Sequence, residues 1–235
     1  MDLSLRIDAP EIMDSQLLPE PELRGTLRFL ERTNRWFGGD RLVFHYLERW
    51  SRRWPRHRPL DVLDVGTGGA DLPVRIARWA SRRGLDARVT GIDSNPEIAR
   101  LARQNVRAFP EIEIVESDLQ SFAQGGRRFD VVIGSLFLHH VSPAGIVEAM
   151  RLCDRLATRA VLFSDLRRCR AGYWATRVYT ALFGNRVVRF DGPLSIRRAF
   201  TSGELSRLAQ QARLPYLRPR RHAFFRLALA GEKGS

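Results

Sequence analysis

The chain has 235 residues, 44% of them hydrophobic, and a formal net charge of +13. This length suits one large α/β core rather than two independent ones, and no stretch approaches the roughly 20 apolar residues that span a bilayer. The first residues, MDLSLRIDAPEIMDS, show no basic-then-apolar signal pattern, which predicts a cytoplasmic protein. Two cysteines, Cys153 and Cys169, are too few for a disulfide scaffold or a cysteine metal cluster, so we expect reduced thiols.

The positive charge is confined to one part of the chain. Residues 1–150 carry 21 Arg and 21 acidic residues, whereas residues 151–235 carry 18 basic and 5 acidic residues. A solvated arginine-rich surface accounts for this excess. The alternative is an anionic partner at that end, such as an anionic substrate, a carrier protein, a membrane surface or a nucleic acid.

Apolar spacing predicts the elements in chain order. Residues 22–54 show helical periodicity and predict two helices separated at Gly38-Gly39. Apolar, β-branched runs then alternate with helical patterns, and Ser94 or Asn95 caps the helix that begins at Pro96. The expected strands are 60–65, 87–92, 111–115, 129–134 and 158–164, and the expected helices are 70–83, 96–108, 143–156 and 201–213.

This alternation is typical of a buried parallel sheet with helices on both faces. The last stretch, YLRPRRHAFFRLALAGE at 216–232, instead predicts two adjoining strands that form a hairpin. The fold class is therefore α/β: a doubly wound, Rossmann-like, seven-stranded and mostly parallel sheet with an antiparallel last strand. A helical cap segment over residues 1–58 precedes it.

The glycine-rich stretch LDVGTGGADL at 63–72 leaves the first strand on an acid. A nucleoside triphosphate site needs Gly-Lys-Ser/Thr after such a turn, and this chain has none. A dinucleotide site needs a small residue where Asp71 stands, and the Asp71 charge would repel a pyrophosphate at the helix N-terminus. An acid there suits a ligand that carries a sulfonium and an ammonium.

VLDVGTGGADL resembles the first motif of class I S-adenosylmethionine-dependent methyltransferases, with Ala70 at the usual third glycine. VTGIDSNPEIARLARQN, EIEIVESDLQSF and FDVVIGSLFLHHV are similar to the next three motifs in the same order. The resemblance implies a domain over residues 59–235 that binds S-adenosylmethionine, yields S-adenosylhomocysteine and needs no metal. In it, Asp93 would hold the ribose hydroxyls and Asp118 the adenine amino group. The implied cofactor-binding residues are Asp64, Gly66, Thr67, Gly68, Asp71, Asp93, Ser94, Asp118, Leu119, Gly134 and Ser135.

The sequence after the fourth strand bears on the methyl acceptor. It lacks the Asp/Asn-Pro-Pro-Tyr/Phe type of motif that holds a planar nitrogen, and neither cysteine is placed as a pyrimidine nucleophile. SLFLHH at 135–140 resembles the small-molecule branch of the family, which modifies quinones and polyketides. LRFLERTNRWFGG and FDGPLSIRRAFTSGEL add a looser likeness to enzymes encoded beside type III polyketide synthases. This resemblance implies a phenolic or pyrone-type acceptor with a long alkyl chain as one option.

His139 and His140 follow the fourth strand, where ligands bind in open α/β sheets. An imidazole titrates near pH ~6.5, so either is a candidate base for a phenol proton, with helix capping or packing as the alternative. Aromatic residues interleaved with Arg at 172–190 predict a lid within residues 168–200, or a core helix whose arginines reach solvent. The substrate-binding candidates are Tyr173, Trp174 and Arg198. The same composition also suits loose contact with a membrane or a lipid-like substrate.

The predicted function is methyl transfer to a phenolic or enolic oxygen of a small molecule in secondary metabolism. C-methylation of an activated ring is the nearest alternative. An RNA methyltransferase that uses the basic C-terminal third is a second alternative, which the absent base-holding motif argues against. A protein that binds the cofactor without transferring a methyl group is the third.

Overall fold

The computed structural model of this chain describes residues 2–15, 18–54 and 57–234. Within them, seven strands form one sheet in the order β3-β2-β1-β4-β5-β7-β6. The strands are β1 (Leu60–Val65), β2 (Ala87–Asp93), β3 (Ile112–Glu116), β4 (Phe129–Ser135), β5 (Ala157–Leu166), β6 (Arg218–His222) and β7 (Arg226–Glu232). All neighbours pair in parallel except β7, which is antiparallel to both β5 and β6. The predicted fold class, including the antiparallel last strand, is confirmed.

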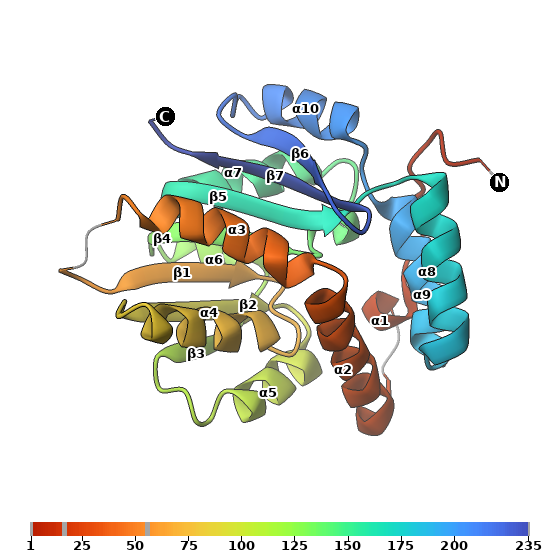
Figure 1. The fold of residues 1–235 in the computed structure, drawn as a ribbon, viewed down its shortest axis with the longest axis horizontal. Helices are drawn as coiled ribbons and strands as arrows, with labels where there is room; N and C mark the ends of the chain where they lie inside the picture. The colour runs from red at the N-terminus through yellow and green to blue at the C-terminus, as the bar shows by residue number, and fades with distance from the viewer. Residues whose placement is uncertain (1, 16–17, 55–56, 235) are drawn as a thin grey trace.

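Helices cover both faces of this sheet (Figure 1). One core cluster joins the sheet to α3 (Gly39–Ser51), α4 (Asp71–Arg82) and α5 (Pro96–Asn105). The other joins it to α6 (Leu119–Gln124), α7 (Ile146–Leu156) and α10 (Ser202–Gln211). Because both faces of the sheet are covered, the central strands are buried on both sides. Their sequences are therefore continuous apolar runs rather than alternating patterns.

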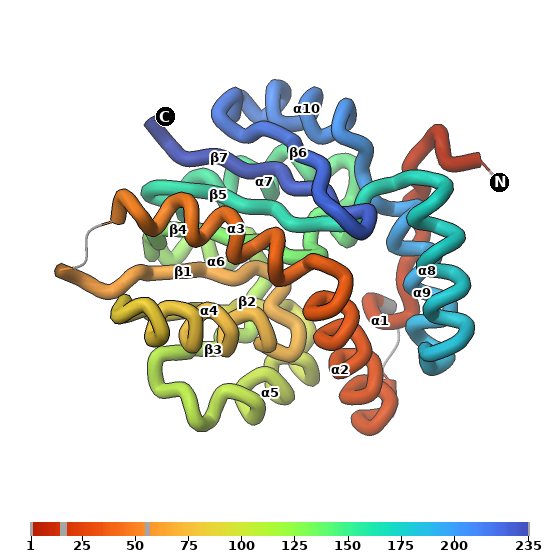
Figure 2. Tube along the Cα trace, in the orientation of Figure 1, coloured from red at the N-terminus to blue at the C-terminus, as the bar shows by residue number. Residues whose placement is uncertain are grey.

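A second group of helices lies beyond the carboxyl ends of the parallel strands, on the right of Figures 1 and 2. It comprises α1 (Ile12–Ser15), α2 (Glu20–Trp36), α8 (Arg170–Phe183) and α9 (Arg186–Arg198). The last two fall within the segment expected as a lid. The remaining N-terminal helix, α3, packs on the sheet instead: Leu47 is fully buried against the core.

The chain also changes direction at this carboxyl edge. It runs from β1 outward through β2 and β3 and then crosses back to β4, which pairs with the other side of β1. Such a reversal leaves a crevice between the loops that follow the two central strands, and this crevice is where open α/β sheets bind ligands. The fold therefore predicts a ligand-binding site at the carboxyl ends of β1 and β4.

Element boundaries differ from the predictions by a few residues, for local reasons. The helix expected from residue 70 begins at Asp71 because Ala70 takes a left-handed conformation, with φ 60°. Asn95, rather than Ser94, caps α5 by accepting from the backbone N–H groups of Glu97 and Ile98. The helix expected from residue 143 begins at Ile146. The short helix α6 was not predicted, because six residues are too few to show a helical period.

Two further expectations concern the thiols and the membrane. Cys153 and Cys169 are both free, and Cys153 is buried in the core. In the part of the chain that the structure describes, no helix has the length and apolar character needed to cross a bilayer.

Candidate active site

A cavity of about 970 Å³ occupies the carboxyl edge of the sheet. Its floor is made by the residues that follow β1, β2 and β4, and its cover by α1, α2, α8 and α9. Ten of the eleven predicted cofactor-binding residues line it: Asp64, Gly66, Thr67, Gly68, Asp71, Asp93, Ser94, Asp118, Leu119 and Ser135. Gly134 is not part of the wall; it is buried beneath Phe137 and Phe163, which would lie 3.1 Å from an added Cβ.

The turn after β1 is built so that its backbone faces the cavity. Gly66 and Gly68 have φ values of 70° and 55°, which favour glycine. The N–H groups of Gly66 and Thr67 donate to the carbonyl of Ile92, and the Thr67 hydroxyl donates to Asp64 at 2.8 Å. These bonds fix the turn and leave the backbone around Gly68 open to close approach by a ligand.

Three carboxylates, Asp64, Asp71 and Asp93, surround this turn, and we call them the acidic end of the cavity. Burial raises the pKa of Asp64 to about 8, and the charges of Asp71 and Asp93 add to the effect. Burial, with repulsion from Glu31, raises the pKa of Asp71 to about 6. Burial also raises the pKa of Asp93. The Asp64 Oδ1 atom has no hydrogen-bond partner among the described residues. A cationic ligand would relieve this repulsion, so the acidic end fits the sulfonium and ammonium that the resemblance implies.

Asp93 lies at the end of β2 and holds two loops together. Its carboxylate accepts from the backbone N–H of Gly68 and from that of Asn95, each at 3.0 Å. A carboxylate has about four acceptor positions, so capacity remains for a pair of hydroxyl groups. Asp118 is engaged differently: it caps α6 by accepting from the N–H groups of Gln120 and Ser121 and from the Ser121 hydroxyl. Its predicted bond to an adenine amino group stays a prediction.

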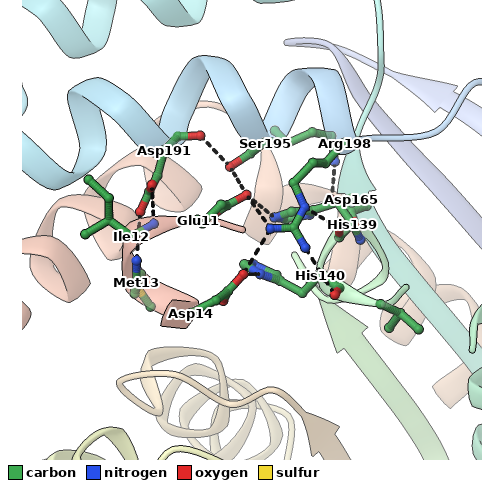
Figure 3. Close-up of polar contacts among 12 residues, drawn as sticks. Glu11, Ile12, Met13, Asp14, His139, His140, Asp165, Asp191, Ser195 and Arg198 are labelled. Carbon is green, nitrogen blue, oxygen red and sulfur yellow. Dashed lines mark hydrogen bonds and ion pairs between the residues drawn. The ribbon is translucent and has the colours of Figure 1, made fainter. Parts of the chain in front are cut away.

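The other end of the cavity holds a cluster of histidines and acids, which Figure 3 shows. His139 and His140 lie in a short 3₁₀ helix (Leu138–His140) after β4, with ring centroids 4.1 Å apart. We call this group, with its acidic and arginine neighbours, the histidine cluster: Glu11, Asp14, His139, His140, Asp165 and Arg198.

Each histidine is paired with a carboxylate through Nδ1. His139 Nδ1 lies 2.7 Å from Asp165 Oδ1, and His140 Nδ1 lies 2.9 Å from Asp14 Oδ2. Burial would raise the pKa of Asp165, but the adjacent His139 and two backbone N–H bonds lower it overall. An ionised Asp165 can only accept, so in the neutral form of the His139 imidazole Nδ1 carries the proton and Nε2 is the acceptor. Asp165, on β5, fixes the tautomer of a histidine that lies 26 residues before it.

Glu11 approaches the other side of His139. Its Oε1 lies 3.9 Å from His139 Nε2 and accepts from the Ser195 hydroxyl at 2.8 Å. Burial, the largest cause, raises the pKa of Glu11 to about 7, so this carboxyl group can exchange a proton near neutral pH. Neither Glu11 nor Asp165 was a predicted site residue, because a lone acid far from any motif carries no sequence signal.

The same cluster contains donor atoms of the kind that bind metals. Glu11, His139 and His140 each place one within 4.8 Å of the others. The Arg198 guanidinium, however, lies 3.0 Å from Asp14 and 3.8 Å from Glu11. Because a fixed cation already lies beside both carboxylates, we interpret the cluster as a group that handles protons.

The predicted substrate-binding residues have three different surroundings. Arg198 lines the cavity, but it donates to the carbonyls of His139 and His140 and to Asp14. Tyr173 is buried and accepts from Arg177 at 3.3 Å, and Trp174 is 54% exposed. Neither of these two aromatic residues is part of the cavity wall; Tyr179, further along α8, is.

Comparisons with known proteins agree with this arrangement. Residues 62–159 match the family model of a methyltransferase domain. Over 92 residues the chain is 33% identical to the release factor glutamine methyltransferase of Koribacter versatilis, covering 39% of this chain and 31% of that protein. Over 121 residues it is 30% identical to the mitochondrial ubiquinone biosynthesis O-methyltransferase of Arabidopsis thaliana, covering 51% of this chain and 36% of that protein. The chain thus matches about a third of the length of these relatives.

A solved structure extends the likeness beyond the matched domain. The plantazolicin methyltransferase BpumL, crystallised with a triazolic desmethylPZN analog and SAH, superposes with a TM-score of 0.62 at 16% identity. The match covers 83% of this chain and 72% of that one. At this identity the match establishes the fold that the two proteins share.

Proposed function

Because residues 62–159 match the family model of a methyltransferase domain, we propose that this protein transfers a methyl group from S-adenosylmethionine to a small molecule. One observation carries the proposal: a single cavity joins three carboxylates around a glycine turn to a histidine held by a buried aspartate. The first group suits a cationic donor and the second suits an acceptor that must lose a proton.

We place the cofactor at the acidic end. Asp64 and Asp71 would offset its positive charge, the Gly66–Gly68 turn would let its methionine part approach the backbone, and Asp93 would bind the ribose hydroxyls. When bound, the cofactor supplies an electrophilic methyl group whose leaving group is a neutral thioether. The matched plantazolicin enzyme holds SAH in its crystal structure, which supports the same ligand here.

The protein's part in the reaction is alignment, exclusion of water and removal of one proton. The acceptor hydroxyl would be held beside His139, whose Nε2 takes the proton while Asp165 stabilises the imidazolium. Glu11, 3.9 Å from that nitrogen, would pass the proton on toward Asp14 and His140 at the half-buried side of the cluster. The acceptor oxygen can then form its bond to the methyl carbon in line with the departing sulfur.

Two features support a small acceptor with an oxygen nucleophile. The cavity is covered by α1, α2, α8 and α9, and its outer part carries aromatic side chains such as Phe37 and Tyr179. Aromatic walls suit a planar phenol, hydroxyquinone or pyrone. The Arabidopsis relative is named an O-methyltransferase, and it is similar over 121 residues, 51% of this chain. Methylation of an activated ring carbon would use the same base, because deprotonation of a ring hydroxyl raises the electron density of the neighbouring carbon.

The proposal is tested by incubating the protein with methyl-labelled S-adenosylmethionine and a panel of phenols, hydroxyquinones and hydroxypyrones, with and without alkyl chains. We expect a labelled product whose methyl carbon resonates in the O-methyl range of the NMR spectrum, and no product with the Asp93→Ala variant. The same assay with total RNA and total protein as acceptors is the control. Label that appears only in RNA or in protein would overturn the proposal.

A further inference from the structure

We propose that Arg226 binds an anionic oxygen of the methyl acceptor, a carboxylate or a phenolate, and that the preferred acceptors are therefore negatively charged aromatic acids. This inference rests on the proposed function and adds a substrate class to it. Arg226 is the first residue of β7, outside every motif that resembles the methyltransferase family. It forms part of the cavity wall, with Phe224 and Phe225 beside it.

The environment of this side chain is unusual for an arginine. Arg226 is only 2% exposed, and its side chain is among the largest that the described chain buries completely. Its Nη2 donates to Asn34 Oδ1 at 2.8 Å and its Nε to the carbonyl of Phe37 at 3.3 Å. Its Nη1 has no hydrogen-bond partner among the described residues. A buried donor group without a partner is rare in native proteins and calls for an unobserved ligand or water.

The charge of Arg226 also has no ion-pair partner among the described residues. Every ion pair found in the described part of the chain involves other residues, so no carboxylate lies within 4.0 Å of this guanidinium. Burial lowers its pKa to about 10, and only Asp165 acts in the opposite direction. A guanidinium stays charged at that value, and proteins seldom bury a charge without a partner. An anion from outside the chain would supply the missing partner.

A comparison with Arg198 shows why the anion is assigned to Arg226. These two are the arginines of the cavity wall within the described residues. Arg198 donates to two carbonyls and to the Asp14 carboxylate, so an anion would have to break existing bonds. Arg226 has an unused N–H group and can form a new charge-assisted bond at no such cost. The sequence predicted Arg198 as a substrate-binding residue. The hydrogen bonds of the two side chains favour Arg226 as the residue that binds the anion.

The surroundings of Arg226 add the aromatic part of the proposal. Phe37 packs edge-on against Tyr179 and Phe224, with ring centroids 4.9 and 5.8 Å apart. Phe37, Tyr179 and Phe224 all line the cavity, and the carbonyl of Phe37 holds the guanidinium in place. A planar acid would lay its ring against this aromatic surface and direct its charged oxygen to Nη1.

The test uses the full chain, saturated with S-adenosylhomocysteine, and isothermal titration with arylcarboxylates and their methyl esters. The probes are 4-hydroxybenzoate, 3,4-dihydroxybenzoate and 2,4-dihydroxy-6-alkylbenzoates. We expect at least one acid to bind about tenfold or more tightly than its ester, the size of a hydrogen bond to a charged group. If no acid is preferred over its ester, the inference is wrong. If S-adenosylhomocysteine itself does not bind, the proposed function fails instead.

Variants then locate the anion. Arg226→Gln should abolish the preference for acid over ester and change the affinity for S-adenosylhomocysteine by less than about twofold, whereas Arg226→Lys should keep part of the preference. The control is Arg189→Gln, which removes the same charge from an exposed position on α9. Because Arg226 forms no ion pair with a described residue, Arg226→Gln should melt close to the parent chain, although it removes the bonds to Asn34 and Phe37. If Arg226→Gln lost as much affinity for S-adenosylhomocysteine as for the acids, the guanidinium would be assigned to the cofactor's own carboxylate, and the inference would be overturned.

Discussion

The two ends of the cavity are built in opposite ways. The acidic end comes from one continuous stretch of the chain, which runs from β1 through the glycine turn and α4 to β2. Asp64, Asp71 and Asp93 all lie in it. The histidine cluster draws on segments far apart in the chain, with Glu11 and Asp14 near the beginning, His139 in the middle and Arg198 near the end. A site built on neighbouring elements can be recognised in the sequence as a motif. A site assembled from distant segments leaves no such pattern.

The contrast extends to electrostatics. The acidic end has carboxylates that form no ion pair with any described residue, and burial raises their pKa values. In the histidine cluster Asp14 and Asp165 are paired with histidines, and burial is outweighed so that their pKa values fall. One end therefore suits a positive ligand, whereas in the other Asp14 and Asp165 already have partners within the chain and Glu11 alone has a raised pKa. We expect substitutions at the two ends to affect different steps.

The largest effect is expected from removing the His139 base. His139→Gln and Asp165→Asn should each lower kcat by about 100- to 10,000-fold, the usual contribution of general base catalysis, and leave the affinity for S-adenosylhomocysteine unchanged. Steady-state kinetics with the best acceptor of the panel, together with isothermal titration, would measure both. A loss of cofactor affinity in either variant would show that the two ends do not act separately.

The next effect concerns Asp93. Replacing it with Ala removes the acceptor for two hydroxyl groups and should weaken S-adenosylhomocysteine binding about 100-fold, since hydrogen bonds to charged groups contribute about 1.5–3 kcal/mol each. Asp118→Ala is the matched comparison, and we expect a loss of about tenfold or less because that carboxylate already caps α6. Thermal melting of both variants checks that they fold. Unchanged binding by Asp93→Ala would contradict the assignment of the ribose.

A smaller effect should appear in the pH dependence of binding. Asp64 and Asp71, with pKa values of about 8 and 6, are partly protonated near neutral pH and must ionise to hold a cation. Affinity for sinefungin, a cofactor analogue with an amine in place of the sulfonium methyl group, should therefore rise about tenfold between pH 6 and 8, with release of protons. Titrations in buffers of different ionisation enthalpy would count those protons. Asp64→Asn should flatten the profile; a profile that falls with pH would contradict the account.

The smallest effects should separate the inner and outer sides of α8. Tyr179→Ala should raise the KM for the acceptor about fivefold, because the ring forms part of the cavity wall. Trp174→Ala should change KM by less than about twofold, because this ring is 54% exposed and lies outside the wall. Kinetics with one acceptor would compare the pair. An equal or larger change with Trp174→Ala would place the acceptor on the outer face of the helix.

The same contrast explains how much of the fold and of the candidate site could be predicted from the sequence. The strand from Leu60 to Val65 could be predicted from its apolar pattern, and the acids at residues 64, 71 and 93 from the motif and the resemblance to family motifs, because pattern and motif are local properties. Tyr173 and Trp174 were chosen on composition, which does not tell which side of a helix faces a cavity. Arg226 could not be singled out among 38 arginines, because only the fold shows that it is buried with one nitrogen, Nη1, left without a hydrogen-bond partner among the described residues.

The most direct measurement is a crystal structure of the chain with S-adenosylhomocysteine. The account predicts the thioether sulfur beside the Gly66–Gly68 turn, both ribose hydroxyls bonded to the Asp93 carboxylate, and the space between His139 and Arg226 left open for the acceptor. A structure in which Asp93 makes no contact with the ligand, or in which the ligand fills the space beside Arg226, would contradict it.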